Sequence, residues 1–126
     1  VGILDAVKQT NWAFIPYSAS VAPNAAVTAA TFNGIYTEVT AYDETTRPVW
    51  DGTRAGSVIS NSSALSTTTF NGSSINVYGC GISSSVTKSS GSGVLLAIAA
   101  LPTAKTGLGI GDALSYLYAL TGSSGA

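Results

Sequence analysis

Residues 75–82, Ile-Asn-Val-Tyr-Gly-Cys-Gly-Ile, decide the fold class of this chain. Ile75, Val77 and Gly79 alternate with Asn76, Tyr78 and Cys80, which is the period of a β-strand. The pair Asn71-Gly72 stands just before the run, and both of its residues tolerate the positive φ of a tight turn. The segment therefore predicts a strand that is entered from a turn.

Turn signals and alternating segments recur along the chain at intervals of about eight to twelve residues. The segments that we expect to be strands are residues 12–21, 35–40, 49–50, 58–59, 64–70, 75–82, 94–101 and 114–120. Seven or eight short antiparallel strands of this kind predict an all-β fold, a β-sandwich or jelly roll. No shift in composition divides residues 1–126, so we expect a single domain.

The connecting segments are rich in small and turn-forming residues. Asn33-Gly34 marks a turn, and residues 22–32 before it predict a loop, although an alanine-rich turn of helix fits them equally well. Ser83 to Gly93 is a Ser/Gly-rich hairpin loop whose only charge is Lys88, and we expect it to be mobile or to meet a partner. Pro102 to Gly111 is expected to be a loop as well.

Residues 94–101 form the longest apolar run of the chain. Both alternating sets of side chains are apolar, which is typical of a central strand covered on both sides or of a strand whose outer face meets another subunit. Its eight residues are too few for a membrane-spanning helix, which needs roughly twenty.

The two ends of the chain differ from the strand-rich middle. Ile3, Leu4 and Val7 recur at helical spacing, so residues 1–11 predict a short N-terminal amphipathic helix. This helix would either cover the core or act as an arm that docks on a neighbouring subunit. Residues 122–126 are expected to be a flexible tail.

Charged residues make up only 9% of the chain, against about 25% in an average soluble protein. A surface of Ser, Thr, Asn, Gly and Ala loses its water cheaply when a partner covers it, which favours a protein packed against neighbours over one with a merely polar exterior. The net charge is −1 and the five cations are scattered. We therefore expect neither nucleic acid nor a membrane as a partner.

The side chains that commonly carry chemistry are scarce. The chain has no His, and its single cysteine, Cys80, is expected to be a buried thiol. Asp51 and Asp112 stand beside glycines, where turn formation explains them, and Asp43-Glu44 lacks the ligand spacing of a calcium loop. We expect no enzyme, no cofactor and no metal site.

Several segments, in their order along residues 38–121, resemble a family of small bacteriophage virion structural proteins, some of them described as tail-fibre proteins. The matching segments are Glu44 with Arg47-Pro48-Val49-Trp50, Asn61 with Ala64-Leu65 and Phe70, Ile75 with Tyr78-Gly79 and Ile82, Gly93 to Leu96 with Ala100-Leu101, Lys105-Thr106, Gly111 to Ser115, and Ala119-Leu120-Thr121.

The resemblance implies a non-catalytic β-sandwich that oligomerises on the virion. Capsid decoration, or cement, proteins of this size are commonly jelly-roll-like and sit between capsid subunits. We expect such a protein here, a dimer or trimer on the outer surface of the head that binds the major capsid protein. The alternative is a tail or tail-fibre component with a receptor- or glycan-binding surface, and a third class is a secreted carbohydrate-binding module.

We predict partner contacts from the N-terminal segment, from two arginines and from the Ser/Gly-rich loop. The residues are Ile3, Leu4, Val7, Arg47, Arg54 and Lys88. The arginines are expected to pair with capsid carboxylates, or else to be solvated charges at the rim of the interface.

Overall fold

The computed structural model describes residues 12–24, 26–56, 58–62 and 65–121. Strands account for 46% of the structure and pair antiparallel, so the predicted all-β class is confirmed. The described elements are β1 (Trp12–Tyr17), α2 (Ala29–Tyr36), β2 (Val49–Trp50), β3 (Thr53–Ala55), β4 (Val58–Ser60), β5 (Ser66–Thr69), β6 (Ile75–Ser83), β7 (Leu95–Leu108), β8 (Ala113–Tyr116) and β9 (Ala119–Thr121).

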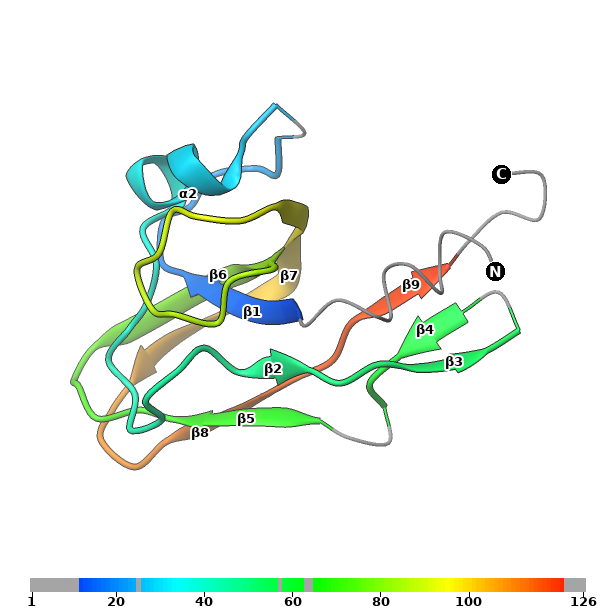
Figure 1. Ribbon diagram of the computed structural model, residues 1–126. Coiled ribbons are helices and arrows are strands. Elements are labelled where there is room, and N and C mark those ends of the chain that lie inside the picture. The colour runs from blue at the N-terminus through cyan, green and yellow to red at the C-terminus, as the bar shows by residue number, and fades with distance from the viewer. Residues whose placement is uncertain (1–11, 25, 57, 63–64, 122–126) are drawn as a thin grey trace.

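Three antiparallel sheets share these strands (Figure 1). The largest has the order β2-β1-β6-β7, the second has the order β3-β4-β9, and β5 pairs with β8 in the third. The chain passes repeatedly from one sheet to another, and two of these passages are short: β2 leads into β3, and β8 leads into β9. These short connections keep neighbouring sheets close to one another.

β1 is the centre of the core because all six of its residues are buried. On one face, Phe14 stacks on Tyr116 of β8, with ring centroids 5.4 Å apart. On the other face, Tyr17 packs edge-on against Tyr36 of α2 at 4.9 Å. The four-stranded sheet is thus covered by α2 on one side and by the β5–β8 pair on the other.

Glycines in β6 make room for the aromatic rings that cover it. A Cβ atom on Gly79 would collide with the Tyr17 hydroxyl and the Ala99 carbonyl oxygen, and one on Gly81 would stand 2.8 Å from the Phe32 ring. Because these two positions have no side chain, the rings of Tyr17 in β1 and Phe32 in α2 can pack directly on the β6 backbone.

Helix α2 agrees with the helical alternative for the end of residues 22–32, and it corrects the predicted turn at Asn33-Gly34 and the predicted strand at 35–40. Thr28 precedes the helix, and its N–H donates to Thr31 Oγ1 at 3.0 Å, one half of a capping box. Phe32 and Tyr36, four residues apart, stack at 5.0 Å and both face Tyr17. These long-range aromatic contacts outweigh the local preference of Asn-Gly for a turn.

β7 is longer than predicted and lies at a different place. It continues to Leu108 through the expected loop, because β6 offers pairing partners as far as Ile75. It also lies at an edge of its sheet in the described structure, so the expectation of a central strand covered on both sides is wrong.

The predicted final strand at residues 114–120 is divided in two. Asn61, which is fully buried, bridges the break: its Nδ2 donates to the Tyr116 carbonyl at 2.9 Å, and its Oδ1 accepts from Tyr118 N–H at 2.9 Å. The predicted N-terminal helix at 1–11 and the tail at 122–126 lie outside the described residues.

Replacing Gly79 with Ala should lower the free energy of unfolding by about 1–3 kcal/mol, because the new methyl group must displace Tyr17 or the β7 backbone. Gly34→Ala in α2 is the matched control. Nothing lies within 4 Å of a Cβ at that position, and the change should stabilise the chain by up to about 1 kcal/mol. Urea unfolding of both variants measures the difference, and equal effects would contradict this account of β6.

Candidate partner-binding surface

Arg47 is buried rather than presented to a partner, which corrects its predicted role. Its Nε donates to Glu38 Oε2 at 2.8 Å and its Nη2 to Glu38 Oε1 at 2.7 Å, so the two side chains form a bidentate ion pair. Arg47 is 1% exposed. Sequence reasoning missed this pair because the two residues are nine positions apart and belong to no local motif.

The same guanidinium fixes the loop that joins β6 to β7, residues 84–94. Arg47 Nη1 donates to the Ser85 carbonyl at 3.0 Å, and Nη2 donates to the Ser90 carbonyl at 2.9 Å. Glu38 Oε1 accepts from Ser89 N–H at 3.0 Å. The loop predicted to be mobile or partner-binding is therefore anchored at several points to the body of the protein.

Lys88, predicted to contact a partner, is engaged within the chain. Its Nζ donates to the carbonyls of Thr40 at 3.2 Å and Tyr42 at 2.9 Å. It also lies 3.8 Å from the centre of the Tyr42 ring, a cation–π contact. Burial, and then the charge of Glu38, raise the pKa of the Tyr42 hydroxyl. Lys88 thus closes the 84–94 loop onto the residues that follow α2.

The structure does not show the side chains of the other predicted contact residues. Arg54 belongs to β3, and its side chain lies outside the described part of the structure. Ile3, Leu4 and Val7 also lie outside the described residues. The structure therefore leaves these four predictions as they stand.

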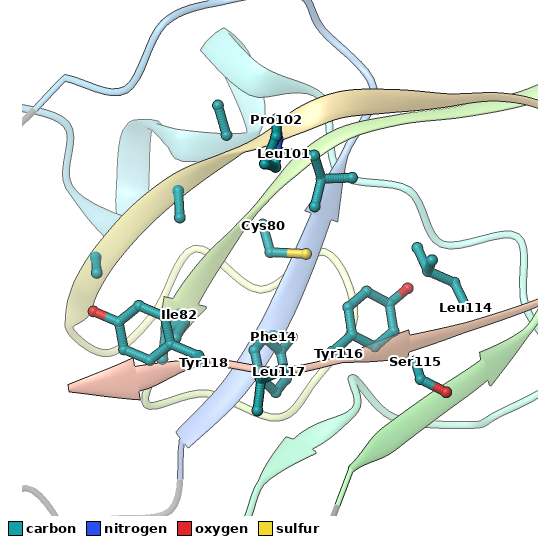
Figure 2. A pocket seen from close by; sticks show the side chains of 13 residues that line it. Phe14, Cys80, Ile82, Leu101, Pro102, Leu114, Ser115, Tyr116, Leu117 and Tyr118 are labelled. Atoms are coloured by element: carbon teal, nitrogen blue, oxygen red, sulfur yellow. The ribbon is translucent and has the colours of Figure 1, made fainter. Parts of the chain in front are cut away.

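An apolar cavity of about 230 Å³ opens between β7 and β8 (Figure 2). Phe14 of β1 and Cys80 and Ile82 of β6 line it from the four-stranded sheet, together with Leu101 of β7, and Leu117 lines it from the segment between β8 and β9. The buried hydroxyl of Tyr116 is satisfied, because it lies 2.7 Å from Thr68 Oγ1. This cavity is suited to an apolar side chain rather than to a charged ligand.

Cys80 has the environment of an inert thiol, as the sequence indicates. It is half-buried, and its sulfur points into the apolar cavity (Figure 2). Burial raises the pKa of this thiol to about 12. The thiolate, which is the reactive form, is therefore disfavoured at neutral pH.

Exposed apolar residues continue from the cavity over the surface. Leu117 is 61% exposed beside β8, and Val94 is 62% exposed just before β7. Along β7, Ala99 and Ala100 are exposed and the leucines and isoleucine before them are half-buried. The edge of β7 and the cavity rim therefore form one weakly polar surface, which we call the β7 surface.

Two further carboxylates accept hydrogen bonds from backbone N–H groups, and Asp112 does so within a turn, as the sequence predicts. Gly109 N–H donates to Asp112 Oδ2 at 2.7 Å, and Thr69 N–H donates to Glu44 Oε1 at 2.9 Å. Over the described residues, no group of three His, Cys, Asp or Glu side chains is placed to hold a metal ion.

No protein-family model matches the chain, and no curated protein or solved structure shows detectable similarity to it. No helix in the described part of the chain is long and apolar enough to cross a membrane. The β7 surface is thus defined by its geometry alone.

Replacing Arg47 with Met should cost about 3–5 kcal/mol of unfolding free energy, because Glu38 would remain buried without its partner. Lys105→Met, at an exposed position of β7, removes the same charge and should change stability by less than about 0.5 kcal/mol. Chemical denaturation measures both effects. A double variant that also carries Glu38→Gln should recover part of the loss, and equal costs for Arg47→Met and Lys105→Met would contradict the anchoring role.

The pH dependence of stability tests the burial of Cys80. In the unfolded chain the thiol ionises near its ordinary pKa of 9.0, whereas the folded protein keeps the proton until about pH 12. Between these values the free energy of unfolding should fall by up to about 1.4 kcal/mol per pH unit, relative to a Cys80→Ala variant. Denaturant unfolding of both proteins from about pH 8 to about pH 11 measures this, and parallel curves would show that the thiol is not buried.

Proposed function

We propose that this chain is a non-enzymatic structural protein of a bacteriophage virion, a decoration protein on the outer surface of the head with a β-sandwich of the jelly-roll kind. Its partners are the major capsid protein and further copies of itself. The observation that carries the proposal is the scarcity of charge on the exterior. The resemblance of residues 38–121 to phage virion proteins agrees with it.

The exterior is even less charged than the composition suggests. Of the eleven charged residues, five cationic and six acidic, Glu38 and Arg47 are buried against each other. The ammonium of Lys88 is bound to backbone carbonyls and to the Tyr42 ring. A surface with so few free charges loses little hydration free energy when neighbouring subunits cover it.

The anchored 84–94 loop supports the same function. Because Arg47, Glu38 and Lys88 hold it in place, little conformational entropy remains to be lost when a partner binds. A decoration protein adds stability to a shell through the area that it buries, and a surface fixed in advance makes that burial more effective.

A tail or tail-fibre component with a glycan-binding surface is the second candidate. One observation favours it: Tyr116, Leu117 and Tyr118 line an apolar cavity, and an apolar or aromatic surface can pack against a sugar ring. Such a site would have to rely on few polar groups for specificity.

Counting copies in purified particles tests the proposal. In particles of the phage that encodes this chain, quantitative mass spectrometry should find it at a copy number close to that of the major capsid protein. Immunogold labelling should place it on the head. A copy number close to that of the tail proteins would favour the second candidate, and absence from the particle would overturn both.

A further inference from the structure

β7 presents an unprotected strand edge. It is the last strand of its sheet in the described structure, and β6 pairs with only one of its sides. Proteins usually protect such an edge with charges, proline, bulges or a short strand. Residues 95–101 carry no charge and no proline, and their single irregularity is a shift in register between Leu95 and Ala97. Pro102, further shifts in register and Lys105 interrupt the strand beyond them.

Hollows flank this edge on both faces of the sheet. On the side of β8 lies the cavity of about 230 Å³, lined by Ala97, Ala99 and Leu101. On the side of α2 lies a groove of about 430 Å³ between residues 95–98 and Val27. An added strand projects its side chains alternately to the two faces, so it would fill both hollows at once.

The strand that fits such an edge is apolar on both of its faces and uncharged. Residues 95–101 of the chain itself, Leu-Leu-Ala-Ile-Ala-Ala-Leu, have this composition. Two identical edges that meet antiparallel are related by a twofold axis, which makes the contact self-complementary and closed. No like charges meet across it.

We propose that two copies of this chain associate through their β7 edges, with residues 95–101 of each copy paired antiparallel. The continuous sheet would then have eight strands, four from each copy. This inference deepens the proposed function and rests on its premise of self-association, since it names the surface through which the copies meet. It specifies a dimer rather than a trimer.

Dimerisation in solution tests the interface. Sedimentation velocity of the full chain over a wide concentration range should show a monomer–dimer equilibrium. Ala99→Lys places two ammonium groups at the shared edge, and should raise the dimer dissociation constant at least about tenfold. Ala99 is exposed in the single chain, so the lysine can remain solvated and the fold intact.

Ile110→Lys is the matched control, because Ile110 is 79% exposed in the turn before β8 and lies away from the edge. It adds the same charge and should leave the dimer unchanged. Ala100→Lys is the second edge variant if Ala99→Lys unfolds, and thermal unfolding identifies folded variants. Hydrogen exchange should show amide protection within residues 95–101 that increases with dimer population.

A chain that remains monomeric at all concentrations, a trimer, or a dimer that both edge variants leave intact would overturn the interface. These results are independent of the particle count. A monomeric chain found on phage heads would remove only the β7 contact, whereas a β7-dependent dimer absent from particles would remove only the virion assignment.

Discussion

The buried ion pair between Glu38 and Arg47 is the constraint on which most of the tertiary arrangement depends. Glu38 follows α2, Arg47 precedes β2, and together they hold the loop between β6 and β7. A buried carboxylate and guanidinium are tolerated only when their hydrogen-bonding groups are satisfied. The requirement to satisfy them fixes three distant chain segments relative to one another.

In the core, large aromatic rings pack where β6 has glycines and therefore no side chains. Gly79 and Gly81 leave β6 bare on the face where Tyr17 and Phe32 pack. α2 is therefore held by aromatic contacts rather than by strong intrinsic helix propensity, since an eight-residue helix is marginal alone. On the opposite face, Phe14 makes the equivalent contact with β8.

The strands at 49–50, 58–60 and 75–83 could be predicted because local alternation and turn residues agree with their tertiary environment. The continuation of α2 through Asn33-Gly34 could not, since this pair favours a turn locally and only the contacts with Tyr17 reverse that preference. The anchoring role of Arg47 could not be predicted from the sequence either, because an ion pair between residues nine positions apart produces no periodic pattern. The apolar character of residues 94–101 is evident from the sequence, but the position of this strand at a sheet edge depends on strand order, which local sequence does not encode.

The passage of single segments between sheets has a mechanical consequence. β2 continues into β3, and β8 continues into β9 across the buried amide of Asn61, so each sheet is tied to its neighbours by unbroken backbone. Tension applied to one sheet is transmitted along covalent bonds instead of being resisted by side-chain contacts alone. Opening of one sheet would therefore displace the strand that continues into its neighbour, which couples the local openings of the two sheets.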